Sequence, residues 1–323
     1  MIAIDVHLDA DTAATMARDV RDGLSAWPKE LAPKWFYDER GSQLFERITE
    51  LEEYYPTRAE RGILSSCAAE IVAAAGSPRT LIELGSGSAA KTRVLLDAMR
   101  EAGTLEIYAP VDISEEITQK TAEALVEEYP GLDVHGLVCD YERHLERVPQ
   151  ALAPRLIAFL GGTVGNLYPG PRRDFLERIR DLLDPGDHLL LGTDLIKDRA
   201  RLELAYDDPQ GVTAEFNKNV LNVLNRELDA DFDLDCFEHV ARFDEREERM
   251  DIRLRSLCDQ EVRLEAIDLV THFAVNEEMR TEISTKFSRP RLEAVYADAG
   301  LELVGWFTDA AGDYALSLAR ASE

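Results

Sequence analysis

From residue 80 onward, short apolar runs alternate with segments of helical spacing. The runs end in glycines or acids, and the first helical segments span 91–103 and 114–130, the second with Ser114 as its N-cap. Strands that alternate with helices predict a mostly parallel sheet with right-handed crossovers and ligands at the carboxyl ends of the strands. The apolar runs lie at 80–87, 105–112, 132–140, 155–166 and 186–194.

After Asp194 the alternation stops. A long helical pattern at 212–228 precedes several strand patterns, in one of which Met250, Ile252 and Leu254 alternate with charged residues. A helix pattern at 290–300 and two strand patterns then close the chain. We therefore expect an α/β parallel-sheet domain interrupted by an inserted α+β lobe. The opening stretch is helical in pattern, which assigns it to neither part.

The composition limits the classes of partner that the protein can bind. The chain has 323 residues, 45% of them hydrophobic, and 63 acidic against 36 basic residues give a formal net charge of −27. Such a charge argues against nucleic acid or an anionic membrane as partner, because both attract clustered cations. The N-terminus lacks the basic and apolar regions of a secretory signal, and no apolar run has the length of a membrane span. We expect a cytoplasmic protein, a monomer, with a small-molecule substrate.

The four cysteines are scattered and show no metal-ligand spacing. We interpret them as reduced thiols and expect no metal. They are Cys67, Cys139, Cys236 and Cys258.

A glycine turn follows the first strand pattern. Gly85, Gly87 and Ala90 fit the loose dinucleotide motif GxGxxA, and Asp112 ends the next strand pattern, where an acid can accept hydrogen bonds from ribose hydroxyls. Both NAD enzymes and S-adenosylmethionine enzymes use this arrangement. A glycine turn with a surface acid and no cofactor is the plainer alternative.

Two further acids favour S-adenosylmethionine. Glu83 stands just before the glycine turn, where a buried acid is costly without a role such as supporting the loop and the amino-acid part of the ligand. Asp140 ends the third strand pattern and can accept from an adenine amino group, with Tyr141 beside the ring. Acids at three successive strand ends form a coherent site for a cationic nucleoside.

Long segments of the chain carry a more specific resemblance. They include PKWFYDERGSQLFERIT, ELGSGSAAKTRVLLDAM, FLGGTVGNL, AYDDPQGVTAEFNKNVLNVLNREL and TEISTKF. The chain resembles, end to end, the histidine-specific Nα-methyltransferases of ergothioneine biosynthesis. The resemblance implies S-adenosylmethionine-dependent conversion of L-histidine to its betaine, hercynine, by a cytosolic, metal-free enzyme. It implies a Rossmann-like methyltransferase domain at 61–196 with 287–323 and a substrate-binding domain at 1–60 with 197–286.

The resemblance also implies site residues. The cofactor site would use Gly85, Lys91, Asp112, Asp140 and Tyr141, with Tyr37 near the methyl-transfer centre. The histidine site would use Tyr54, Asn166, Tyr206, Glu282 and Ser284.

The chain departs from the family pattern at two positions. Gly162 replaces a serine, a change of little expected effect. Ile252 replaces a methionine near the substrate side chain and could reshape the ring pocket.

The chemistry is consistent with these residues. Methyl transfer from a sulfonium is an in-line displacement that needs a deprotonated, aligned amine. Asn166 can donate to a carboxylate and accept from an amine, whereas a carboxylate there would favour the unreactive ammonium form. Without the resemblance, Tyr37 and Tyr54 would be interpreted as core aromatics, and 280–287 as a strand with one solvated face.

Three alternatives remain open. The same chemistry could act on another amino acid, such as one with an indole side chain, through Ile252. An NAD-linked oxidoreductase would rest on GxGxxA with Asp112. A non-catalytic nucleoside-binding regulator is disfavoured because Tyr37, Asn166 and Glu282 are all retained.

Overall fold

The structure, a computed structural model, describes residues 1–7, 12–148 and 152–322. The chain forms two compact units. Unit 1 comprises Met1–Asp9, Pro56–Ile196 and Phe287–Glu323, and unit 2 comprises Ala10–Tyr55 and Lys197–Lys286.

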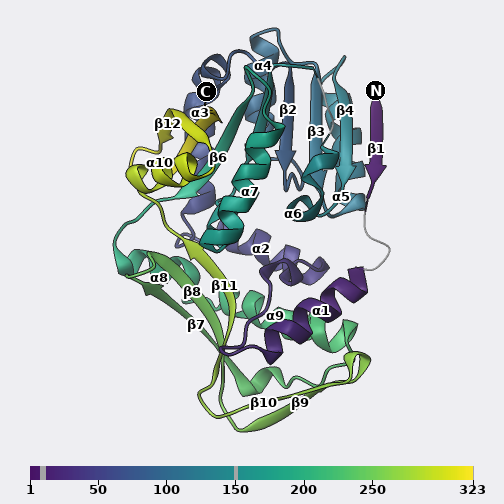
Figure 1. The fold of residues 1–323 in the computed structure, drawn as a ribbon, viewed down its shortest axis with the longest axis vertical. Coiled ribbons are helices and arrows are strands. Elements are labelled where there is room, and N and C mark those ends of the chain that lie inside the picture. The colour runs from purple at the N-terminus through teal and green to yellow at the C-terminus, as the bar shows by residue number, and fades with distance from the viewer. Residues whose placement is uncertain (8–11, 149–151, 323) are drawn as a thin grey trace. The chain divides into compact units, whose positions relative to one another are not determined.

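Unit 1 is built on an eight-stranded sheet in the order β1-β4-β3-β2-β5-β6-β13-β12 (Figure 1). The first six strands in this order are parallel, and β13 runs antiparallel to both β6 and β12. This mostly parallel sheet confirms the predicted α/β class. The strands are β1 (Ile2–Val6), β2 (Thr80–Leu84), β3 (Ile107–Asp112), β4 (Asp133–Val138), β5 (Arg155–Phe159), β6 (His188–Asp194), β12 (Leu301–Thr308) and β13 (Tyr314–Ala321).

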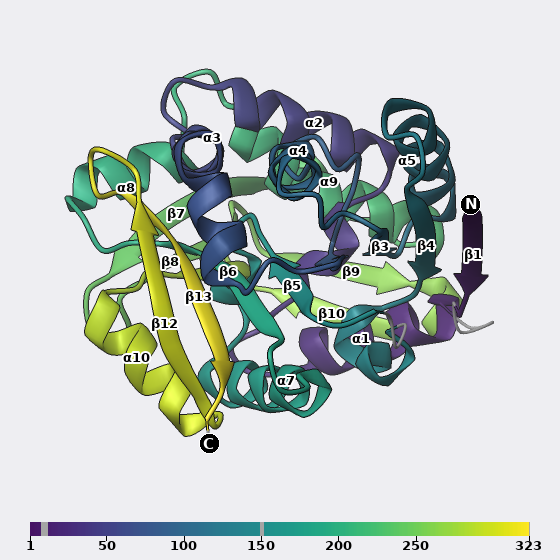
Figure 2. The same ribbon diagram turned by 90° about the horizontal axis from the view of Figure 1, so that it is seen from above.

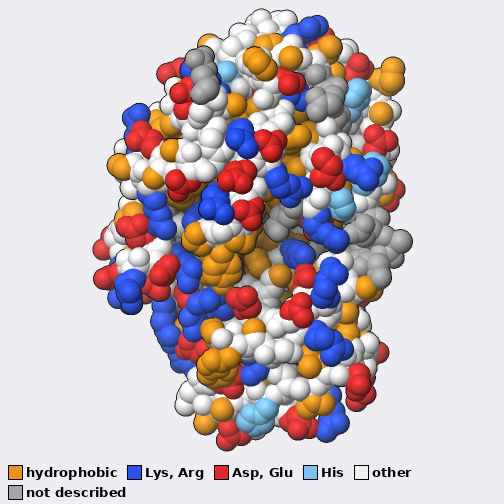
Figure 3. All heavy atoms as spheres, viewed as in Figure 1, with side chains coloured by type: hydrophobic (Ala, Val, Ile, Leu, Met, Phe, Trp, Pro, Cys, Tyr) orange, Lys and Arg blue, Asp and Glu red, His pale blue; other side chains and the backbone are white. Residues whose placement is uncertain are grey.

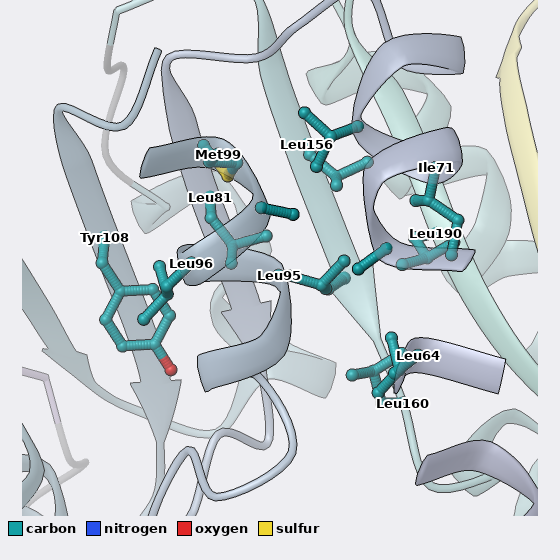
Figure 4. Close-up of a cluster of buried hydrophobic side chains, with 14 of the residues drawn as sticks. Leu64, Ile71, Leu81, Leu95, Leu96, Met99, Tyr108, Leu156, Leu160 and Leu190 are labelled. Atoms are coloured by element: carbon teal, nitrogen blue, oxygen red, sulfur yellow. The ribbon is translucent and has the colours of Figure 1, made fainter. Parts of the chain in front are cut away.

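Helices cover both faces of this sheet. Figure 2 shows α3 (Pro56–Ala74), α4 (Arg93–Glu101) and α5 (Glu115–Glu128) on one face and α7 (Pro169–Leu182) and α10 (Arg289–Asp298) on the other. The first face is sealed by apolar side chains of α3 and α4 against β2, β5 and β6, among them Leu64, Leu95, Leu81, Leu156 and Leu190 (Figure 4). Ser114 caps α5 as predicted, its hydroxyl accepting from the Ile117 N–H at 3.3 Å.

Two features at the start of the chain differ from the sequence prediction. Residues 2–6 form a strand rather than a helix, and this strand, β1, pairs in parallel with β4 at the edge of the sheet of unit 1. Helix α3 begins at Pro56 and also belongs to unit 1, so residues 1–60 are not all part of the second lobe. The pattern hid β1 because it is short and mostly exposed on both faces.

In its described residues, unit 2 combines four α-helices with two small antiparallel sheets. The helices are α1 (Thr12–Ser25), α2 (Glu39–Glu50), α8 (Arg199–Tyr206) and α9 (Val212–Glu227). The sheets are β11-β8-β7 and β10-β9. Their strands are β7 (Phe237–Asp244), β8 (Arg249–Ser256), β9 (Gln260–Leu264), β10 (Leu269–Phe273) and β11 (Glu278–Thr285).

The predicted alternation in β8 holds with one exception. Met250, Ile252 and Leu254 are buried, but Asp251 is buried as well. Two arginines, Arg253 and Arg280, bind its carboxylate, which makes burial of the charge tolerable and holds its pKa well below the usual range, despite desolvation that acts in the opposite direction.

Acidic and basic side chains are interspersed over the face of the molecule shown in Figure 3. Across the described residues, no helix is both long enough and apolar enough to cross a membrane.

Candidate functional site

The strand order of unit 1 defines where a ligand can bind. From β2 the chain moves outward through β3 and β4, then crosses back to β5 and β6 on the other side of β2. In such sheets the ligand crevice lies beyond the carboxyl ends of the strands at this reversal. The glycine turn after β2 and the turn Thr163–Asn166 (η3) after β5 both leave from that edge.

The Asp112 carboxylate holds the glycine turn in place through hydrogen bonds to backbone N–H groups. Its Oδ2 accepts from the Gly87 N–H at 2.9 Å and its Oδ1 from the Ser114 N–H at 3.0 Å. Gly85 and Gly87 have φ of +70° and +50°, values that favour glycine. The Ser86 hydroxyl beside them is buried and has no hydrogen-bond partner among the described residues. The turn therefore presents an unsatisfied polar atom at the predicted cofactor edge.

Glu83 supports the same turn from within the protein. Its carboxylate accepts from the Thr92 hydroxyl and, at 2.5 Å, from the Tyr108 hydroxyl, and its side chain is buried. Desolvation raises the pKa of Glu83 to about 7, against the opposing effect of the two hydroxyls and of the nearby Lys91. Its hydrogen bonds with Thr92 and Tyr108 join the segment after the turn to β3, so Glu83 supports the loop from behind.

The remaining cofactor candidates lie at neighbouring strand ends. Asp140 follows β4, and the ring of Tyr141 packs edge-on against Phe159 with centroids 5.5 Å apart. Lys91 forms an ion pair with Glu60, a buried residue of α3 that sequence analysis missed because nothing in its helical pattern distinguishes it.

Asn166 ends the turn η3, whose first residue follows Gly162. Gly162 has φ +72°, and a Cβ there would lie 3.3 Å from the Tyr314 hydroxyl. A serine at this position would adopt a strained conformation, so the glycine suits this turn.

In unit 2, aromatic rings cluster between α2, α8 and α9. Tyr37 lies edge-on to Phe45 and Phe216, with centroids 5.7 and 5.6 Å apart. The ring of Tyr54 lies edge-on to that of Tyr206, with centroids 6.1 Å apart. The predicted substrate tyrosines are therefore neighbours in space although far apart in sequence.

Glu282 of β11 belongs to this group. It is paired in register with Ile252 of β8. Burial raises the pKa of the Tyr37 hydroxyl well above its usual range, and the negative charge of Glu282 and the hydroxyls of Tyr54 and Tyr206 raise it further. Tyr37 as a whole residue is 47% exposed, so part of it faces solvent. Tyr37, predicted as a catalytic residue near the methyl-transfer centre, thus lies in the same unit as the other histidine candidates.

Ser284 lies on the same strand, in a buried polar cluster. Its hydroxyl is 2.9 Å from that of Tyr206, and the Lys286 ammonium donates to both oxygens at 2.9 and 2.8 Å. Lys286 is fully buried and was missed by sequence analysis. The strand alternation that pairs Glu282 with Ser284 also places Lys286 on their side, a signal that could have identified it.

A second polar layer supports Tyr206. The His239 Nε2 bonds to the Tyr206 carbonyl at 2.8 Å, and the Asn217 amide lies 2.8 Å from His239 Nδ1. Desolvation lowers the pKa of His239. Because the Asn217 amide nitrogen is a donor, Nδ1 accepts from it, and Nε2 donates to the Tyr206 carbonyl.

The structure thus brings the candidates together in two groups. Unit 1 carries Glu83, Gly85, Lys91, Asp112, Asp140, Tyr141 and Asn166. Unit 2 carries Tyr37, Tyr54, Tyr206, Ile252, Glu282 and Ser284.

Comparison with known proteins identifies the family. Residues 16–321 match the histidine-specific, S-adenosylmethionine-dependent methyltransferase family. The chain belongs to this family. A histidine N-alpha-methyltransferase of Mycolicibacterium smegmatis is 54% identical over 314 residues, covering 97% of each chain. One of Mycobacterium tuberculosis is 50% identical over 319 residues, covering 98% of this chain and 99% of that protein. Ergothioneine biosynthesis protein 1 of Neurospora crassa is 33% identical over 313 residues, which span 95% of this chain and 34% of that protein.

Membership in the histidine-specific methyltransferase family decides between the cofactors. The family is S-adenosylmethionine-dependent, so the GxGxxA turn and Asp112 belong to a methyltransferase, and the NAD-linked interpretation is withdrawn.

Proposed function

We propose that the protein transfers methyl groups from S-adenosylmethionine to the α-amine of L-histidine and forms hercynine, as the first step of ergothioneine biosynthesis. The observation that carries the proposal for histidine is the group of Glu282, Ser284, Tyr206 and Lys286 in unit 2. It combines a carboxylate, two hydroxyls and an ammonium, the functional groups that a zwitterionic amino acid with an imidazole side chain requires.

The residues of unit 1 fit the cofactor. The Ser86 hydroxyl and the open turn at Gly85 and Gly87 can receive its polar groups, Asp112 and Asp140 its ribose and adenine, and Tyr141 its ring. The ammonium of Lys91 would pair with the cofactor carboxylate. When bound, the cofactor supplies an electrophilic methyl group on a sulfonium.

Glu282 would accept from an imidazole N–H, and Ser284 would serve the other ring nitrogen. Because an ammonium only donates, Lys286 directs the O–H protons of Tyr206 and Ser284 away from itself. Because the two hydroxyls also share a hydrogen bond, Tyr206 donates to Ser284, and Ser284 donates to the ring nitrogen.

Asn166 would hold the amine and carboxylate with neutral groups. A neutral amide leaves the amine pKa low, which keeps the lone pair available for displacement. Three methyl groups must enter one nitrogen, so a site with few obligatory N–H contacts suits repeated transfer.

Transfer of labelled methyl groups to a panel of amino acids tests the proposal. We expect label in histidine and little in tryptophan. Label in an indole amino acid instead would favour the second candidate function, for which buried Ile252 beside Glu282 is the supporting observation. Absence of label in any amino acid would overturn both.

A further inference from the structure

Glu60 is a buried carboxylate that the reaction described above does not use. It lies in the first turns of α3 and its side chain is 1% exposed. A buried charge is costly unless it is paired and hydrogen-bonded, so its partners indicate its purpose.

The partners of Glu60 come from three separate parts of unit 1. Its Oε2 forms an ion pair with the Lys91 ammonium in the glycine turn. Its Oε1 accepts from the Gly161 N–H at 2.8 Å and from the Tyr314 hydroxyl at 2.9 Å. One carboxylate therefore joins the turn after β2, the turn after β5 and the start of β13.

The glycines around Glu60 leave room for this carboxylate. A Cβ at Gly192 would lie 2.4 Å from Glu60 Oε1 and 2.7 Å from the Tyr314 hydroxyl, contacts that real side chains do not make. Gly161 has φ +79°, so the turn after β5 also favours glycine where its N–H meets Glu60. The backbone of β6 is thus shaped around the Glu60 network.

Lys91 keeps an accessible side after this pairing. Its side chain is 26% exposed, and an ammonium has three N–H donors, one of which meets Glu60. Pairing with Glu60 restricts the flexible lysine stem to one direction and leaves donors for a second anion.

We propose that Glu60 is a positioning residue that aims Lys91 at the carboxylate of the cofactor and fixes the turn leading to Asn166. This inference rests on the proposed function, because it takes S-adenosylmethionine as the ligand of Lys91. Glu60 itself contacts no reacting atom. It acts through Lys91 on the cofactor and through Gly161 on the turn that carries Asn166.

The variant Glu60→Gln removes the action on Lys91 and keeps the action on Gly161. In this variant the amide oxygen still accepts from Gly161 and Tyr314. The amide nitrogen and the Lys91 ammonium are both hydrogen-bond donors, so the contact between them is lost. We expect S-adenosylhomocysteine, which has a carboxylate, to bind about tenfold more weakly, the size of a lost charge-assisted contact. We expect 5′-methylthioadenosine, which lacks the amino-acid part, to bind within about twofold of the wild-type affinity.

Glu60→Ala removes the acceptor of Gly161 as well, so we expect the KM for histidine to rise in this variant and not in Glu60→Gln. Glu70→Gln, on the exposed side of the same helix, is the control and leaves all affinities unchanged.

Calorimetric titration of the full chain with both nucleosides decides the matter. Equal loss of both affinities in Glu60→Gln, or no loss of either, would overturn the proposal. If Glu60→Gln does not fold, Lys91→Gln tests the pair, and wild-type affinity for both nucleosides in that variant would overturn it too. Failure of the wild-type protein to bind S-adenosylhomocysteine would instead overturn the proposed function itself.

Discussion

Glu282 is half-buried on β11, in register with Ile252 and close to the Tyr37 hydroxyl. We predict that Glu282→Ala raises the KM for histidine about ten- to hundredfold, the effect of losing one hydrogen bond to a charged group. The KM for S-adenosylmethionine should stay near its wild-type value. Steady-state kinetics with each substrate varied in turn provides the measurement.

A matched control for this variant is Glu261→Ala, an exposed glutamate of β9 in the same unit. It should leave both KM values unchanged. If Glu282→Ala weakened both substrates equally, Glu282 would not be the residue that recognises imidazole.

The raised pKa of Glu83 leads us to predict that the stability of the protein depends on pH. Its pKa is raised from 4.5 to about 7 in the folded protein, so between these values the folded state holds a proton that the unfolded state has lost. The free energy of unfolding contributed by Glu83 therefore falls as the pH rises through this window, by about 3 kcal/mol in total.

Glu83→Gln lacks this contribution. We predict that the free energy of unfolding of the variant, relative to wild type, rises by about 3 kcal/mol from pH 4 to pH 8. Urea titrations of both proteins across this range test it. A constant difference would show that the folded-state pKa of Glu83 is not raised.

At the residue scale the sequence revealed part of the candidate site. Glu282, Ser284 and Tyr206 were identified through the family resemblance, since each alone could be an ordinary strand or helix residue. Glu60 was missed because its importance depends on Tyr314, a partner distant in sequence, and such a pairing leaves no local pattern. Lys286 was missed although the strand alternation places it on the side of Glu282 and Ser284, because only the fold brings it to Tyr206.

At the scale of elements, helix α9 carries Phe216 and Asn217, begins at Val212 and depends on a side chain that precedes it. Asp208 is buried and accepts from the Val212 N–H at 3.1 Å and from the Thr213 N–H at 2.7 Å. Desolvation acts to raise its pKa, but the hydrogen bonds outweigh this and hold the pKa below the usual value.

Gly211 occupies the N-cap position of α9, and the Asp208 carboxylate accepts from the first N–H groups from further upstream. We predict that Asp208→Ala lowers the free energy of unfolding by about 1–2 kcal/mol, the size of a lost capping interaction. Because the folded pKa of Asp208 is depressed, its stabilisation is present above about pH 4 and is lost as the pH falls further. Asp208→Asn, which keeps an acceptor, is the control. Equal unfolding midpoints for Asp208→Ala and wild type in urea at pH 7 would contradict the capping role.

Most strands and helices were predictable from the chain because buried parallel strands form apolar runs bounded by glycines. Strand β1 was not, because its apolar run is short and its residues are mostly exposed on both faces. The burial of Asp251 was also hidden, since its tolerance depends on arginines from two strands.

At the scale of the whole molecule, the division into two units was anticipated near residues 196 and 286 because the alternation of strands and helices stops and resumes there. The sequence did not predict that the N-terminal segment belongs to unit 1, because this assignment follows from the pairing of β1 with β4.

The net charge of −27 leads to a further prediction at this scale. Self-repulsion of like charges opposes the compact state, and salt screens it. We predict that the thermal unfolding midpoint rises by a few degrees, on the order of 5 °C, between 0.02 and 0.5 M NaCl. Differential scanning calorimetry over this range of salt concentration measures it. A steady fall would show that local ion pairs dominate over net repulsion.

The central claim, methylation of the histidine α-amine, is tested most directly by mass spectrometry and nuclear magnetic resonance of the product formed from L-histidine and S-adenosylmethionine. The account predicts a product with three methyl groups, all on the α-nitrogen. A methyl group on the imidazole ring, or unmodified histidine after complete incubation, would contradict it.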